Sequence, residues 1–416
     1  MSVKKITAIV VVFAVTSIAW MILGASTSSR TGSSFSSLKQ EVASLYGSEL
    51  IIRTPECYTK TVRIQEEIVD GKRVERKIEE KKAFDLAGSD IDMDILKDRR
   101  KKGNLWFPTF KARFSGKYSF DVSSIKPGQE VFLFTSLYSS SSIYDSIGIR
   151  INGVEYDDLS PLIRREEISV EPDSEGRVSF EISYNCTGME SMMYYISQQE
   201  AISQVKNFRF VLRTDFKDID FPAEMMSPTE KIEEDGGYFL KWSLDNSVTG
   251  KDIGLIIPNK LNPGEIVTRV TFFAPVPLLF FFAVLLVAAT LLNTDLHPMH
   301  FAFLAATFFS FHLMYSYFSD HMNLYLTFGI SSAVSLLLTI TYLRLFAPRL
   351  IAYVLAPVIQ FVYLVVFSFS FFFDGTTGVI VTVCSVVTLF ILMQITGRLD
   401  WNEVFDKGLR KTERRQ

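Results

Sequence analysis

The sequence contains few of the side chains and motifs that catalysis and cofactor binding require. Its 416 residues include three cysteines and four histidines. It has no Walker A motif, no dinucleotide-binding fingerprint and no HExxH pair, so the commonest phosphate, dinucleotide and zinc chemistries have no support in the sequence. We therefore expect a protein that is not an enzyme and that needs no cofactor.

Charge is absent from several long stretches. The chain is 48% hydrophobic with a mean hydropathy of +0.20, and phenylalanine alone occurs 36 times. A helix of about 20 apolar residues spans the roughly 30 Å hydrocarbon core of a bilayer. We predict a five-span transmembrane domain over residues 271–396, with spans at Phe272–Leu292, Phe301–Phe318, Leu324–Leu343, Leu350–Phe373 and Val379–Ile395.

The N-terminus carries one further apolar run. Residues 6–23 hold no charge and follow Lys4 and Lys5. The small residues at Gly24 and Ala25 also suit a cleaved signal peptide, but the run is longer than the roughly 7–15 residues of a signal-peptide core. We predict an uncleaved transmembrane anchor over residues 1–25. The serine-rich stretch 26–37 is expected to be a flexible polar tether.

The distribution of Lys and Arg predicts the topology. Six spans place both termini on one side of the membrane, and short cytoplasmic segments are rich in basic residues. The short loops around Asp320 and Asp374 carry none, so we place them outside. Both termini, including a basic tail over 397–416, are then cytoplasmic, and residues 26–270 lie outside. The basic residues in the predicted cytoplasmic segments are Lys4, Lys5, Arg344, Arg349, Arg398, Lys407, Arg410, Lys411, Arg414 and Arg415.

Residues 38–270 read as an exported β-rich domain. Short runs of β-branched and aromatic residues alternate with turn signals, and Asp70-Gly71 and Asn152-Gly153 suit hairpin turns that need positive φ. This spacing is typical of an antiparallel sandwich or barrel, built as one large domain or two small ones. The predicted fold class is an α+β membrane protein with a signal-anchor helix, a sandwich-like exported domain and a five-helix transmembrane bundle.

The exported segment is mildly acidic. Residues 25–270 contain 33 basic and 39 acidic residues, a net charge of −6, which argues against nucleic acid as a partner. The basic block over 97–103 is expected to be a solvated loop. The apolar spans make the lipid bilayer the one partner that composition indicates.

Cys57 and Cys186 fall in the exported segment and Cys384 in the last predicted span. An oxidising compartment permits one disulfide between the first two. Their spacing does not show that they meet, so that pairing stays open. Asn185, Cys186 and Thr187 also match the N-glycosylation pattern.

His297 and His300 flank Pro298 and Met299 between two predicted spans. A zinc site needs three or four ligands, and no further ligand is close in the sequence. A tight cytoplasmic turn explains the segment better. Asp295 would cap the following helix, Pro298 would begin it, and His297 would pair with a neighbouring loop or the tail.

Two other membrane chemistries can be weighed. Gly329-Ile-Ser-Ser332 resembles the GxSx element of rhomboid proteases, but no histidine follows His321 to serve as a base for Ser331. Coupled transporters place ionisable groups inside spans. Here only His312, Gln360 and Gln394 are notably polar, while Pro275, Pro277 and Pro357 could kink helices. A passive route for a neutral or lipidic substrate remains as the alternative function.

Four short motifs occur in and around the predicted spans and the exported domain. Residues 296–299 read Leu-His-Pro-Met, residues 319–321 read Ser-Asp-His, and Asp400-Trp401 follows the last predicted span. In the exported domain, Gly237 and Trp242 fit a Gly-Phe-x-x-x-Trp strand. Together these motifs resemble those of the CreD family of inner membrane proteins, named for cell envelope integrity. The family's Trp-Pro-His-Pro-Ser-Phe stretch is replaced here by residues 214–221.

This resemblance implies a role in envelope stress. The family is associated with two-component regulation, the β-lactam response and tolerance to a nuclease bacteriocin, and it supplies no catalytic or binding residues to carry over. We therefore expect no catalytic, cofactor or metal residues. The expected function is a non-enzymatic polytopic protein that supports envelope integrity through its exported domain. The resemblance implies a bacterial inner membrane with residues 26–270 in the periplasm. It also implies an unidentified periplasmic protein, envelope protein or cell-wall component as a partner besides the lipid bilayer.

Overall fold

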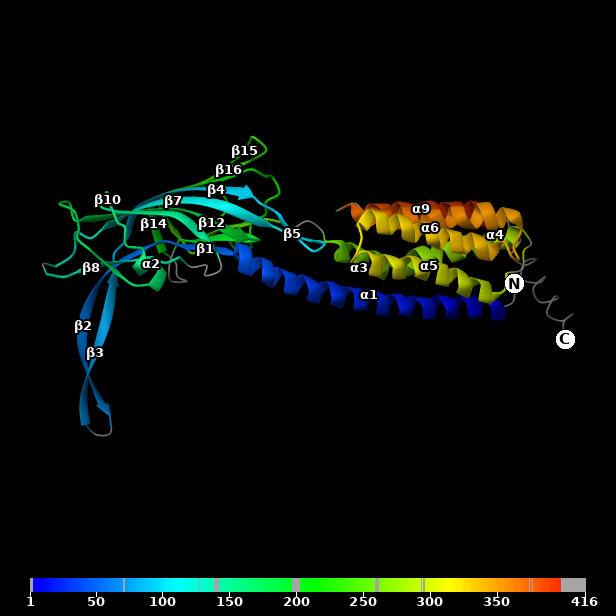
Figure 1. Cartoon of the computed structure of the whole chain (residues 1–416), viewed down its shortest axis with the longest axis horizontal. Coiled ribbons are helices and arrows are strands. Elements are labelled where there is room, and N and C mark those ends of the chain that lie inside the picture. The colour runs from blue at the N-terminus through cyan, green and yellow to red at the C-terminus, as the bar shows by residue number, and fades with distance from the viewer. Residues whose placement is uncertain are drawn as a thin grey trace. The chain divides into compact units, whose positions relative to one another are not determined.

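The computed structural model divides into two compact units (Figure 1). It describes residues 3–69, 72–126, 128–137, 142–196, 203–258, 262–292, 294, 296–373, 375 and 377–397, with the backbone alone for 3, 63–69, 72–78, 203, 377, 395 and 396. The helical unit contains Met1–Ser36 and Leu261–Gln416, and the β unit contains Ser37–Lys260. The β unit ends near residue 261, whereas the sequence predicted its end at 270. The reason is that the chain is already helical from Pro263.

The β unit is built on an eight-stranded sheet. Its polar and apolar side chains alternate along the strands, as in Asp90, Ile91, Asp92 and Met93, so the sheet has one buried and one solvated face. The strands, in spatial order, are β10 (Val154–Glu155), β9 (Tyr144–Ile151), β12 (Arg177–Met189), β7 (Thr109–Asp121), β4 (Leu86–Lys97), β14 (Ser203–Thr214), β16 (Gly237–Thr249) and β15 (Glu230–Glu234).

Smaller sheets supply the rest of the β unit. One has the order β1 (Leu50–Arg53), β13 (Ser191–Tyr195) and β17 (Ile253–Ile256). A second has the order β11 (Ile168–Val170), β8 (Val131–Phe134), β2 (Glu56–Val69) and β3 (Lys72–Ala83). The remaining elements are the hairpin of β5 (Arg100–Lys102) with β6 (Leu105–Phe107) and the short helix α2 (Ser160–Arg164).

One apolar core fills the space between these layers. The inward side chains of β4, β7, β12, β14 and β16 meet those of the smaller sheets, and the two sets bury one another as in a sandwich. Phe210, for example, packs edge-on against Trp242 at 5.6 Å and lies 5.1 Å from Tyr194 of β13. The described residues therefore form a single core in the β unit rather than two.

The α+β, β-rich class is confirmed, but the sheets are mixed rather than antiparallel. β4 pairs with β14 in parallel, as does β1 with β13. Parallel neighbours need a long crossover, and more than 100 residues separate β4 from β14 in the chain. Alternation along a strand reports which face is buried and carries no information about the direction of the neighbouring strand.

The predicted hairpins can be compared with the structure directly. Asn152 (φ 49°) and Gly153 (φ 79°) connect β9 to β10 as the sequence predicted. β2 and β3 pair antiparallel up to Val69 and Lys72, while Asp70 and Gly71 themselves lie outside the described residues. The basic block over 97–103 is not a loop, since it contains β5, which pairs with β6.

Six helical segments make up the described part of the helical unit. They are α1 (Val3–Tyr46), α3 (Pro263–Phe273) with α4 (Pro275–Leu291), α5 (Pro298–Phe318), α6 (Leu324–Leu343), a segment over Ile351–Phe372 and α9 (Thr377–Thr396). The last residues of α1, from Ser37, belong to the β unit. The fifth combines α7 (Ala356–Gln360) and α8 (Phe367–Phe369) with π-helical turns at Ile351–Leu355 and Phe361–Val366 and a 3₁₀ turn at Ser370–Phe372. α3 and α4 meet at a bend of 41°, which a proline at the start of α4 explains.

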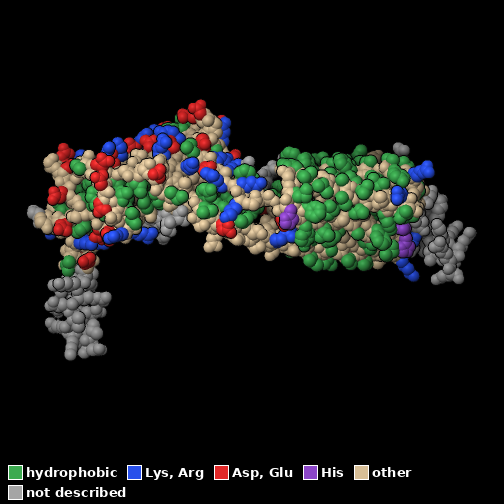
Figure 2. Space-filling model, in the orientation of Figure 1, with side chains coloured by type: hydrophobic (Ala, Val, Ile, Leu, Met, Phe, Trp, Pro, Cys, Tyr) green, Lys and Arg blue, Asp and Glu red, His purple; other side chains and the backbone are tan. Residues whose placement is uncertain are grey.

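Several of these helices fit a membrane protein. Four of the described helices, at Lys4–Tyr46, Pro298–Phe318, Leu324–Leu343 and Ile351–Phe372, are long and apolar enough to cross a bilayer, and the bent pair α3–α4 makes up to five. Gly378–Gln394 is apolar but shorter. Apolar side chains cover the visible surface of the helical unit, whereas charged ones are concentrated on the β unit (Figure 2).

Residues 26–37 are helical, so the prediction of a flexible tether is wrong. They lie inside α1. Serine and threonine side chains there donate to the preceding helical turn, as Thr27 does to the Leu23 carbonyl and Ser36 to the Gly32 carbonyl. Arg30 adds a tertiary anchor. Its guanidinium donates to the Ser316 carbonyl at 2.6 Å and lies 3.2 Å from a carboxylate oxygen of Asp320.

An ion-pair cluster joins the segment before β11 to the β2–β3 hairpin. Glu167 accepts hydrogen bonds from the Tyr58 hydroxyl at 2.5 Å, from Lys81 at 3.0 Å and from Lys60. Burial alone would raise the pKa of Glu167, but these hydrogen bonds outweigh burial and lower it from 4.5 to about 2. Burial, followed by the bond to Glu167, raises the pKa of Tyr58 to about 12.

We expect Glu167→Gln to reduce the free energy of unfolding at neutral pH by about 1–2 kcal/mol, allowing for partial exposure to solvent. Because the folded pKa is the lower one, this stabilisation is complete above about pH 5 and disappears as the pH falls from about 4.5 towards 2. Urea midpoints followed by circular dichroism should therefore differ between wild type and variant at neutral pH and converge in acid. The exposed neighbour variant Glu166→Gln is the control, and a gap that persists at the lowest pH would contradict the assignment.

Candidate functional site on the polar face of the eight-stranded sheet

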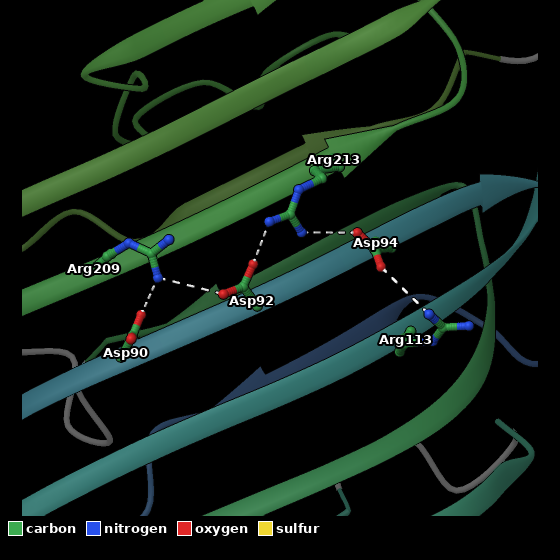
Figure 3. A network of polar contacts seen from close by, with 6 residues as sticks. All are labelled: Asp90, Asp92, Asp94, Arg113, Arg209 and Arg213. Atoms are coloured by element: carbon green, nitrogen blue, oxygen red, sulfur yellow. Dashed lines mark hydrogen bonds and ion pairs between the residues drawn. The ribbon is translucent and has the colours of Figure 1, made fainter. Parts of the chain in front are cut away.

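The solvated face of the eight-stranded sheet carries a network of alternating charges. Strand alternation places Asp90, Asp92 and Asp94 of β4 on this face. Parallel pairing then sets Arg209 of β14 beside Asp90 and Arg213 beside Asp94. We call the six residues drawn in Figure 3 the charge ladder: Asp90, Asp92, Asp94, Arg113, Arg209 and Arg213.

Each arginine of β14 bridges two carboxylates. Arg209 donates to Asp90 at 2.5 Å and to Asp92 at 3.4 Å. Arg213 donates to Asp92 at 2.8 Å and to Asp94 at 3.1 Å, and Arg113 of β7 lies 4.0 Å from Asp94 (Figure 3). The hydrogen bond to Asp90 raises the pKa of Arg209 above its ordinary value, so its charge is fixed over the physiological range.

The alternation of sign continues across the sheet. Arg150, Glu181, Lys117, Asp90 and Arg209 occupy one row across β9, β12, β7, β4 and β14. Opposite charges at facing positions stabilise a sheet and fix its register. Since the side chains are partly exposed, each pair contributes at most about 1 kcal/mol. The row therefore contributes little stability, and its main effect is a surface on which positive and negative side chains alternate at set positions.

Two hollows lie at the ends of the charge ladder. The hollow at the Asp94 end has a volume of about 620 Å³, and Arg113, Arg213 and Asn185 line it together with apolar Leu96 and Ile143. The hollow at the Asp90 end has a volume of about 400 Å³ and contains Arg209, Lys117 and Glu181. Ligand sites combine apolar surface with a few oriented polar groups, and the Asp94 hollow has this composition.

The carboxylates of the charge ladder are paired within the protein. All three are engaged by guanidinium groups. Among the described residues, no three or more His, Cys, Asp or Glu side chains gather as a metal site. Each hollow presents positively charged donors and negatively charged acceptors to a ligand.

The His297–His300 segment begins α5. Pro298 is the first helical residue, as predicted. The helix cap is His297, whose Nδ1 accepts from the Met299 amide at 3.3 Å, so the prediction that Asp295 caps the helix is wrong; Asp295 lies outside the described residues. His300 bonds the Tyr342 hydroxyl at 2.9 Å and stacks on Phe346 at 3.7 Å. Both rings therefore have structural partners at the helix start.

The other polar residues singled out in the helices are separated. His312 is buried on α5, where its Nδ1 donates to the Phe308 carbonyl at 2.9 Å. Ser331 and Gln360 are buried on α6 and α7, and Gln394 is exposed on α9. Ser331 has no hydrogen-bond partner, so a serine–base pair of the rhomboid type is not formed among the described residues.

Both cysteines of the β unit are free and buried, so the disulfide left open by the sequence is absent. Burial raises the pKa of Cys57 and of Cys186 to about 12 in each case. Asn185, the first residue of the glycosylation pattern, lies within β12 and lines the Asp94 hollow.

The residues of the resembling motifs have clear structural roles where the structure describes them. Asp320 holds Arg30 of α1, and Gly237 and Trp242 lie on β16. Asp400 and Trp401, the tail beyond 397, and Asp374 lie outside the described residues. The charge ladder was missed in the sequence. Acids at every second position of 90–94 and arginines at 209 and 213 carried the signal, but nothing local shows that the two strands are neighbours.

Comparison with known proteins gives no family assignment. No protein-family model matches the chain, and no curated protein is significantly similar to it. The function must be argued from the structure itself.

Proposed function

We propose that this chain is a non-enzymatic, polytopic inner membrane protein whose β unit lies in the periplasm and binds a cell-wall polymer. Both termini are then cytoplasmic. In this proposal the charge ladder with its two hollows is the binding surface, and the helical unit holds that surface at the membrane. The protein would support envelope integrity by tethering the membrane to the wall.

The observation that carries the proposal is the fixed pattern of both charges along one exposed sheet. Cell-wall polymers of the peptidoglycan type carry amino and carboxylate groups on peptides attached to uncharged sugars. The Arg113 side chain is 74% exposed and lies 4.0 Å from Asp94, so it can bind a ligand carboxylate in bidentate fashion. Arg213, already bonded to Asp92 and Asp94, adds positive charge beside it, and Asp94 and Asp145 can accept from ammonium groups. The apolar atoms of Leu96 and Ile143 suit the faces of sugar rings.

Two further features support a tether rather than an enzyme. The three carboxylates of the charge ladder are engaged by arginine. The resemblance of residues 296–299 and 319–321 to CreD motifs also points to envelope integrity and offers no catalytic residue.

The test is co-sedimentation of the full-length protein, held in nanodiscs, with isolated cell-wall sacculi. We expect wild type to pellet with the sacculi and Arg113→Ala/Arg213→Ala to bind at least about tenfold more weakly, since each charge-assisted hydrogen bond contributes on the order of 1.5–3 kcal/mol.

The matched control is Arg177→Ala. Arg177 is an exposed arginine on the same sheet that lines neither hollow, and its loss should leave binding unchanged. Wild type that stays in the supernatant would refute wall binding. If Arg177→Ala weakened binding as much as the double variant does, the effect would reflect net charge and not the hollow.

A further inference from the structure

A stripe of hydroxyl side chains runs along the interior of the helical unit. Thr327, Ser331, Ser335 and Thr339 are spaced four residues apart on α6, and all four are fully buried. At 3.6 residues per turn they share one face, and the 12-residue interval covers about 18 Å. That is more than half of a bilayer's roughly 30 Å hydrocarbon core.

One end of the stripe is closed by hydrogen bonds. Thr339 and Thr307 of α5 share a bond of 2.8 Å, and Ser335 donates to the Thr307 carbonyl at 2.6 Å. Gln360 of α7 points at the stripe, because its Nε2 donates to the Ser335 hydroxyl at 2.8 Å. Three helices therefore contribute polar groups to one buried line.

Four further polar groups have no hydrogen-bond partner among the residues that the structure describes. The Ser331 and Thr327 hydroxyls, the Gln360 carbonyl oxygen and the Tyr315 hydroxyl are buried without a hydrogen bond. A serine in this helix can bond the backbone carbonyl four residues earlier, as the neighbouring Ser332 does to Phe328 at 2.8 Å. Ser331 does not form such a bond. Buried polar atoms are nearly always paired with protein or with an ordered molecule, most strictly at membrane depth.

We propose that α5, α6 and α7 enclose a hydrated path for water-sized, uncharged molecules. The occupant accepts from Ser331 or Thr327 and donates to the free Gln360 oxygen. It is uncharged because α5, α6 and Ile351–Phe372 contain no Asp, Glu, Lys or Arg. Two π-helical turns flank α7, which carries Gln360, and such turns recur at functional positions in helices.

Osmotic shrinkage of proteoliposomes, followed by stopped-flow light scattering, tests the path with water itself. Wild type should shrink severalfold faster than protein-free vesicles, and Ser331→Leu and Gln360→Leu should return to the protein-free rate. Ser332→Ala, which alters a hydroxyl already bonded to its own helix, should keep the wild-type rate. Carbonate extraction first confirms that every variant is inserted, because this inference requires the helices to cross the bilayer.

The change in Tm caused by Ser331→Ala in detergent is an independent test, because the proposal predicts its sign. If a molecule occupies the site, Ser331→Ala removes one of its partners and lowers the Tm. If the site is empty, the same change removes an unpaired buried hydroxyl and raises the Tm, which overturns the proposal. Wild type no faster than protein-free vesicles overturns it as well. Neither result bears on wall binding, which is measured separately by co-sedimentation with sacculi and depends on residues of the β unit.

Discussion

Trp242→Ala is expected to reduce the free energy of unfolding of the β unit by about 3–5 kcal/mol, the usual cost of removing a large aromatic side chain from a core. Trp242 is fully buried on β16. Its ring packs edge-on against Phe210 of the adjacent strand, and its indole N–H donates to the Met226 carbonyl at 2.9 Å. Alanine would leave a cavity and an unpaired carbonyl together.

The buried thiols of the β unit provide the measurement. Cys57 and Cys186 are shielded in the folded state, so the rate at which an alkylating reagent modifies them in a urea series reports unfolding of this unit in the full-length protein. Cys384→Ser removes the third thiol. Trp242→Phe should lie between wild type and Trp242→Ala because it keeps most of the packing. A Trp242→Ala midpoint equal to that of wild type would show that the core does not depend on this ring.

Gly237→Ala is expected to destabilise the same unit by about 3 kcal/mol or more, at or beyond the usual upper range for overpacking. A Cβ at position 237 would lie 1.7 Å from the carbonyl oxygen of Thr214. The obstacle is backbone, which no side-chain rotation relieves. β14 and β16 pair in register at Thr214 and Tyr238, so the strands would have to separate at this end of the sheet.

Gly236→Ala is the matched control. Gly236 has a φ of +87°, yet a Cβ there would meet nothing within 4 Å. Its replacement should therefore cost only the left-handed conformational strain of about 1 kcal/mol. The thiol-protection assay ranks the two variants. Equal costs would mean that the close approach at Gly237 is relieved by a small backbone shift.

Gly237 and Trp242 show what a sequence motif reveals about a strand and what it leaves out. The glycine and the tryptophan, five positions apart, were recognised by resemblance as part of one strand. The reasons for each residue lie elsewhere in the chain. Glycine is required by the Thr214 carbonyl and tryptophan by Phe210 and Met226, all of which are distant in sequence.

The helices divide in the same way. Pro298 begins α5 because its ring and missing N–H suit a first helical turn, and that could be read locally. The extension of α1 through residues 26–37 could not. Serine-rich sequence resembles a linker in composition, but here the hydroxyls bond within the helix and Arg30 is held by Ser316 and Asp320, 286 and 290 positions later.

The sequence by itself determined the apolar runs, the β-rich segment between them, the Asn152-Gly153 turn and the start of α5, because periodicity, turn chemistry and proline geometry act within a few residues. The tertiary structure alone decided which strands are neighbours and in which direction. It placed Arg209 beside Asp90, which lies 119 positions earlier in the chain, and directed Gln360 at the α6 stripe. It also left Cys57 and Cys186 unbonded. These are long-range pairings, set by the burial of a shared core, and no local pattern encodes them.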